Sequence, residues 1–179
     1  MAGLLFLALA YLAVGQAGAT RNEAQTAADA AALAAAQARR DLLAGAWRED
    51  VLDPKRWEDI FHGNVEGPDS SCGRADQLAA QNDAHVLACS PDGFLGYTVE
   101  VETNEPVGDT IVPGTEDIRA QASATAVIEP KCTFRLPAEE AGDDVLPELQ
   151  CEDGDWQLDP EDLVDLPEPE DLFDVHLAD

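Results

Sequence analysis

The fold of this chain is decided by its first 36 residues, MAGLLFLALAYLAVGQAGAT (1–20) followed directly by RNEAQTAADAAALAAA (21–36). The first stretch is uncharged and mostly apolar, and the second is built from strong helix formers. No proline interrupts the join. We therefore expect one helix that passes from an apolar medium into water, with a transmembrane segment over residues 1–20 and an alanine-rich stalk helix and junction over residues 21–62.

The apolar segment allows three interpretations. Twenty residues at about 1.5 Å each would just cross a hydrocarbon layer of roughly 30 Å. Its densest part, residues 2–14, is also short enough for a signal peptide, and Ala17-Gly18-Ala19 resembles a cleavage site. No basic residue precedes the apolar run, so we prefer a retained anchor that extends upstream of Met1. A cleaved signal peptide and a buried core helix stay open.

The polar residues within the alanine-rich run have a specific pattern. In GQAGATRNEAQTAADAAALAAAQARRD (15–41), Asn22, Gln25 and Asp29 are set among alanines. This run resembles the signature of TadE/TadG-like Flp pilus assembly proteins, particularly the TadG-related proteins of actinobacteria. The stretch IVPGTEDIRAQASATAVIEPKC (111–132) resembles the same group. The resemblance implies a pilin-like component of a Flp/Tad-type pilus assembly or secretion apparatus, with a membrane helix, an extracellular C-terminal domain and other apparatus proteins as partners.

The charge of the chain excludes several classes of partner. Ten basic residues stand against 37 acidic ones, for a net charge of −27, which argues against nucleic acid and anionic lipid headgroups. The acidic C-terminal segment, residues 137–179, contains 17 acidic and no basic residues, and we interpret it as a solvated, partly disordered tail. The alternating acids of residues 152–159 leave a weak divalent-cation association open. An EF-hand-like loop there is disfavoured, because Leu158 and Val164 stand where glycine and glutamate are needed.

The four cysteines form an even set without a CxxC spacing, which favours two disulfides in an exported protein. Of the three connectivities we prefer Cys72 with Cys89 and Cys132 with Cys151. The first pair would brace a short helix predicted within residues 73–88, and the second would close a loop between late strands. A zinc site that combines cysteines with His62, His85 or His176 is the weaker alternative, because none of the spacings fits.

The middle of the chain predicts an α+β domain over residues 63–136. The stalk helix should end near Glu49, and a short helix at residues 55–61 should follow Pro54 and stop at Gly63. Residues 95–103 and 118–128 alternate like strands, joined by a turn-rich connection over 104–117. We expect an antiparallel sheet that a helix covers. The junction should be packed by four residues: Trp47, Trp57, Ile60 and Phe61.

No motif for catalysis or cofactor binding is present in the sequence, and the three histidines are isolated from one another, so we predict a non-enzymatic protein without cofactors. We expect it to act by helix packing, because small residues recur every four positions and let helices approach closely. These residues are Gly15, Ala19, Ala24, Ala28, Ala32 and Ala36. The alternative is that the alanine face lies on the protein's own strands. Two other functions stay open: a secreted, disulfide-stabilised acidic binding domain with a cleaved signal, and an envelope hydrolase.

Overall fold

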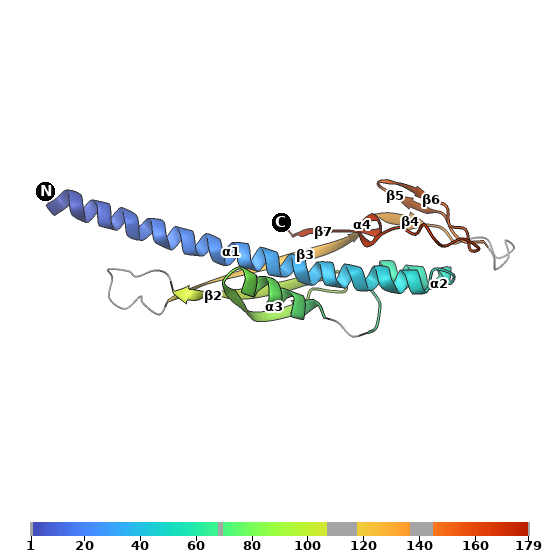
Figure 1. The fold of residues 1–179 in the computed structure, drawn as a ribbon, viewed down its shortest axis with the longest axis horizontal. Coiled ribbons are helices and arrows are strands. Elements are labelled where there is room, and N and C mark those ends of the chain that lie inside the picture. The colour runs from blue at the N-terminus through green and yellow to red at the C-terminus, as the bar shows by residue number, and fades with distance from the viewer. Residues whose placement is uncertain (1, 68–69, 107–117, 137–144, 179) are drawn as a thin grey trace.

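The long N-terminal helix dominates the molecule (Figure 1). The computed structural model describes residues 2–67, 70–106, 118–136 and 145–178, and among residues 2–17 it gives more than the backbone course for Gly3, Leu4, Tyr11 and Gly15 only. Helix α1 runs unbroken from Ala2 to Glu49, about 70 Å at 1.5 Å per residue. Its C-terminal part lies along the folded domain and its N-terminal part projects beyond it. The expected continuous helix and its end at Glu49 are confirmed.

A four-stranded antiparallel sheet lies beneath α1, in the order β1-β2-β3-β7. A smaller antiparallel sheet, β4-β5-β6, lies near the far end of the domain. The strands are β1 (Ala84–Pro91), β2 (Gly96–Pro106), β3 (Arg119–Pro130), β4 (Cys132–Phe134), β5 (Leu149–Cys151), β6 (Gly154–Trp156) and β7 (Phe173–Leu177). The other helices are α2 (Pro54–Phe61), α3 (Ser71–Gln81) and α4 (Pro169–Leu172).

Side chains alternate across the main sheet, so one face is apolar and the other is polar. On β2, Tyr97, Val99 and Val101 are buried beneath the helices, whereas Glu100 is exposed on the opposite face. This is the pattern of an antiparallel sheet covered on one side only. The predicted α+β class, with a helix over an antiparallel sheet, is therefore confirmed.

The helix predicted within residues 73–88 is wrong in its extent. Helix α3 ends at Gln81, and Ala84 already begins strand β1. Between them Asn82 occupies the C-cap position, and Asp83 adopts a positive φ of 53°. Asn and Asp tolerate this left-handed backbone better than most residues. The left-handed backbone at Asp83 therefore ends the helix before the last residues of the predicted range.

An aromatic cluster packs the junction between α1, α2 and the sheets. Trp47 and Trp57 lie with ring centroids 5.4 Å apart, and Phe134 contacts Trp57 at 5.3 Å. Phe61 lies 5.2 Å from Phe173 of β7. The four predicted junction residues are all buried, and Phe134 and Phe173 join them. These aromatic side chains supply much of the apolar area that holds the far end of the domain together.

The acidic C-terminal segment is not a separate solvated tail over the part that the structure describes. Strand β7 pairs with residues 126–130 of β3, and Leu172 and Phe173 are fully buried. In FDVHL, the side chains of Phe173, Val175 and Leu177 point to the core while the acid Asp174 faces outward. The negative charge is thus carried on the solvent side of elements that are anchored by apolar residues. Residues 137–144 of the segment lie outside the described residues.

Both disulfides form in the pairs that the sequence favoured. Cys72–Cys89 ties α3 to β1, and Cys132–Cys151 joins directly opposed residues of β4 and β5. All four cysteines are consumed, which excludes the zinc alternative. A disulfide that closes a loop of this length contributes about 3 kcal/mol in the chain-entropy model.

Candidate functional site: the two halves of the long helix

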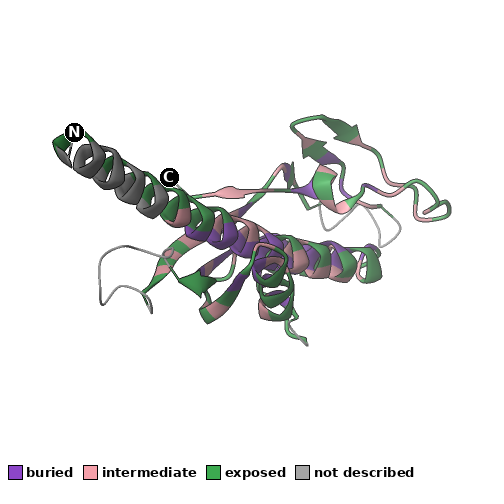
Figure 2. Ribbon diagram, turned by 60° about the vertical axis from the view of Figure 1, so that its left-hand side comes forward, coloured by how far each residue is buried: buried purple, intermediate pink, exposed green. Residues whose placement is uncertain are grey.

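The alanine face of α1 is the core of the molecule. Ala24, Ala28, Ala32 and Ala36 are completely inaccessible to solvent, as are Ala27, Ala31 and Ala35. This face packs on β2 and β3, and α3 packs along its side. Figure 2 shows the buried residues of α1 on the side that faces the sheet and α3. Alanine suits this position because its short side chain lets the helix backbone approach the sheet closely.

Four of the six residues proposed for helix packing therefore lie inside the chain's own fold. From Ala24 to Ala36 the structure agrees with the alternative, in which the alanine face lies on the protein's own strands. A second helix could reach these four alanines only if α1 left the sheet. The other two proposed residues, Gly15 and Ala19, are exposed on the projecting half.

The projecting half of α1 offers small residues to a neighbour. A Cβ atom added at Gly15 or Gly18 would meet no atom within 4 Å, and Tyr11 is 84% exposed. Glycine, alanine and an aromatic side chain are common at surfaces where helices or lipids meet. Within the described residues, no helix is long and apolar enough to cross a membrane.

One buried and one exposed arginine hold α1 to the rest of the domain. Arg39 is 9% exposed and donates hydrogen bonds to the carbonyl oxygens of Gly63 at 2.7 Å and Val65 at 3.3 Å. Arg48, near the end of the helix, donates to the carbonyl oxygen of Pro167 at 3.4 Å. The chain segment after α2 and the C-terminal segment are thus both held to the same helix. Sequence reasoning missed these roles, because a backbone acceptor leaves no pattern in the sequence.

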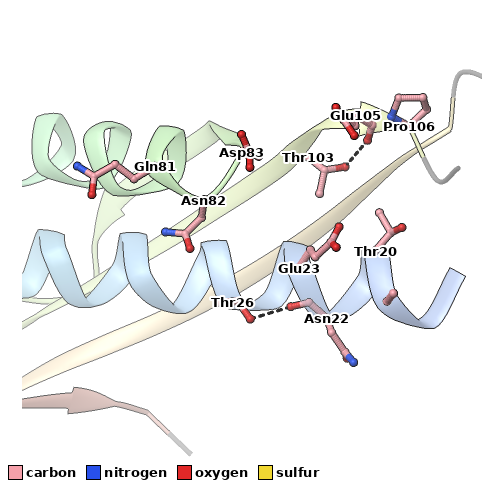
Figure 3. Close-up of a pocket in the computed structure, with 11 residues that line it drawn as sticks. Thr20, Asn22, Glu23, Thr26, Gln81, Asn82, Asp83, Thr103, Glu105 and Pro106 are labelled. Atoms are coloured by element: carbon pink, nitrogen blue, oxygen red, sulfur yellow. Dashed lines mark hydrogen bonds between the residues drawn. The ribbon is translucent and has the colours of Figure 1, made fainter. Parts of the chain in front are cut away.

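A polar groove of about 710 Å³ lies where α1 begins to leave the domain. Figure 3 shows Thr20, Glu23 and Thr26 of α1 on one side and residues of α3 and β2 on the other. Thr26 donates to the carbonyl oxygen of Asn22, whereas Thr103 donates to that of Glu105 and accepts from the amide of Ala120 on β3. The lining also includes Gln81, Asn82, Asp83 and Pro106. The groove separates the domain from the projecting half of the helix.

The histidines and acids of the described residues form local polar contacts. His62 caps α2, with its Nδ1 atom 2.6 Å from the carbonyl oxygen of Glu58. His85 lies on β1 beside Glu102, and His176 lies on β7 beside Asp174. No group of three His, Cys, Asp or Glu side chains among the described residues could hold a metal ion. Of the alternating acids of residues 152–159, Glu152 and Asp153 lie in the turn of the β5–β6 hairpin and Asp155 lies in β6; Asp153 pairs with Lys131.

The comparisons with known proteins concern the N-terminal helix. Residues 1–38 match the family model described as "Tad: Putative Flp pilus-assembly TadE/G-like". No curated protein and no solved structure matches the chain. The matched region covers the projecting half of α1 and the whole of the buried alanine face from Ala24 to Ala36. This match supports a role in Flp pilus assembly.

Proposed function

We propose that this protein is a pilin-like component of a Flp/Tad-type pilus assembly or secretion apparatus. The observation that carries the proposal is the division of one helix into two halves. The half that projects from the domain lies within the residues that match the TadE/G-like family model. The other half is fixed in the core of an exported-type domain with two disulfides.

In this proposal the projecting half is a single membrane anchor. The support is the uncharged, apolar sequence of residues 1–20 and the placement of the disulfide-bonded domain immediately beyond it. The domain then lies outside the cytoplasm, where disulfides persist. Its strongly acidic surface keeps it away from anionic headgroups, which leaves the helix as the membrane contact.

The protein acts by packing against other apparatus proteins and not by catalysis. Gly15 and Ala19 are four residues apart on the projecting half, so they lie on one face of the helix. Small side chains at this spacing let a second helix approach closely within a bilayer. The support for a non-catalytic role is that the sequence carries no recognisable motif for catalysis.

A replacement of the small residues tests this function. The double variant Gly15→Leu/Ala19→Leu keeps the helix apolar and adds bulk where a neighbouring helix would lie. We expect unchanged membrane recovery and loss of pilus assembly in cells whose native copy is deleted. Ala80→Leu, at an exposed position of α3, is the matched control and should assemble normally. Normal pili with the double variant would refute packing through this face.

The N-terminus of the cellular protein separates this proposal from a secreted binding domain. Mass spectrometry of membrane fractions should find the residues before Thr20 still attached to the domain. A mature chain that starts near Thr20 and is recovered from the medium would instead support a cleaved signal peptide.

A further inference from the structure

The main sheet has one edge that is only half covered. Strand β3 pairs with β2 along residues 119–127, whereas β7 covers it only at residues 126–130. Beyond these pairs, the amide of Ala178 donates a hydrogen bond of 2.8 Å to the carbonyl oxygen of Thr125. Among the described residues, this is the last backbone hydrogen bond between the β7 segment and β3. No described strand pairs with residues 121–124 on that side. We call residues 121–125 of β3 the open edge.

The direction of the backbone groups at the open edge follows from its neighbours. The amide of Ile128 donates toward β2, to the carbonyl oxygen of Leu95, and Thr125 accepts from the β7 side. Backbone groups in a strand alternate between the two sides, so even-numbered residues bond to β2 and odd-numbered ones face β7. The amide and carbonyl groups of Gln121 and Ser123 therefore point out of the open edge.

Burial along β3 changes at the point where β7 ends. Ala126 and Ile128, which have β7 beside them, are 0% and 2% exposed. Ala122 and Ala124 face the same side of the sheet and lie under the same helix, yet both are only half-buried. A hollow of about 240 Å³ lies beside them, lined by Gln25, Asp29, Ser123, Ala124, Thr125, Leu177 and Ala178. The space that a further strand would fill is thus present next to β3 and below α1.

The charges around the open edge define what could occupy it. Asp29 lines the hollow, and Glu100 lies opposite Ser123 on the outer face of the sheet. Glu102, opposite Gln121, is already paired with Arg119 and His85 and accepts a hydrogen bond from the Gln121 side chain. The chain carries a net charge of −27, which repels a second copy and attracts cations. Outward-pointing lysine or arginine side chains of an added strand could extend across β3 toward Glu100. Its inward-pointing side chains would lie next to Ala122 and Ala124.

We propose that the open edge binds an extended segment of a partner protein, which continues the sheet beyond β7 and carries cationic side chains on its outer face. Main-chain hydrogen bonds from Gln121 and Ser123 supply the register, and the carboxylates select the charge of the segment. This goes beyond the proposed function, because it names a contact surface on the domain that does not depend on membrane insertion of α1.

The test uses the full chain in detergent micelles and a short peptide of alternating lysine and valine. Binding should slow hydrogen exchange at the amides of Gln121 and Ser123. A peptide of the same sequence, N-methylated at the amides that would face β3, keeps the charge but cannot pair, and it should bind about tenfold more weakly or worse. An alternating glutamate and valine peptide should bind more weakly still.

Two variants of Ser123 separate strand pairing from general charge attraction. In Ser123→Pro the residue that loses its amide hydrogen faces the open edge and not β2, so the sheet should stay folded while peptide binding falls about tenfold. Ser123→Ala retains the amide and should bind like the parent chain. Equal binding of the methylated peptide, or slowed exchange only in residues 145–178, would overturn the proposal in favour of unspecific charge attraction. A dimer of the parent chain that Ser123→Pro abolishes would overturn it in favour of a second copy.

Discussion

Replacing Ala28 by leucine tests whether the alanine face belongs to the protein's own core. Ala28 is completely inaccessible, in the middle of a face that packs on β2 and β3. The larger side chain has no space there, so α1 must move away from the sheet or neighbouring side chains must leave their preferred rotamers. Overpacking of this kind costs about 1–3 kcal/mol. Helix propensity changes by only a few tenths of a kcal/mol and cannot produce the same effect.

The assay is thermal unfolding of the full chain with both disulfides intact, followed by circular dichroism. For a domain of this size each kcal/mol lowers Tm by about 2–4 °C, so we expect a decrease of about 2–12 °C. Ala80→Leu makes the same chemical change at an exposed position of α3 and should leave Tm nearly unchanged. An unchanged Tm for Ala28→Leu together with lost self-association or partner binding would refute the internal role of this face.

Three further predictions concern the domain. Gly63→Ala should destabilise it by about 1–3 kcal/mol in urea unfolding, because φ is +76° there and the new Cβ would lie 2.7 Å from the carbonyl oxygen of Phe94. Gly45→Ala, with open space around the new Cβ, is the control and should be neutral or slightly stabilising. The double variant Cys132→Ala/Cys151→Ala should lose about 3 kcal/mol of unfolding free energy in the same assay, and mass spectrometry without reduction should still find Cys72 linked to Cys89. Four free thiols in the parent chain taken from the cell surface would contradict the pairing. The hydrogen bond to Asp153 raises the pKa of Lys131 above its ordinary 10.5, so the pair should stabilise the fold fully below pH 10.5 and lose this effect as the pH rises through the pKa of Lys131 in the folded protein. Asp153→Asn should remove that loss of stability at alkaline pH. Identical alkaline unfolding curves for the parent chain and the variant would show that the pair does not contribute.

The parts of the fold that the sequence predicted are those specified by local patterns. The end of α1, the start of α2 at Pro54 and the two long strands all follow from periodicity and from helix-breaking residues. The boundary between α3 and β1 was missed because it depends on the backbone of Asn82 and Asp83. A careful reading of FDVHL could have found β7, since its apolar residues alternate, but acidic composition concealed the pattern.

The candidate site was predictable only in part. The spacing of Gly15, Ala19 and the four alanines is visible in the sequence, but a small-residue face serves equally for packing within a chain and between chains. The structure divides the set, because the sheet reaches only as far along α1 as the alanines from Ala24 onward. Contacts across long sequence separations, such as Arg39 with Gly63 or β7 with β3, leave no comparable local signal.

The most direct test of the central claim is the topology of the chain in cells. Protease added to intact protoplasts that express the full chain should remove the disulfide-bonded domain, and a fragment that contains residues before Thr20 should remain with the membrane. The account predicts this cleavage because the projecting half of α1 is the anchor and the domain lies outside. Full protection of the domain in intact protoplasts, with digestion only after lysis, would contradict it.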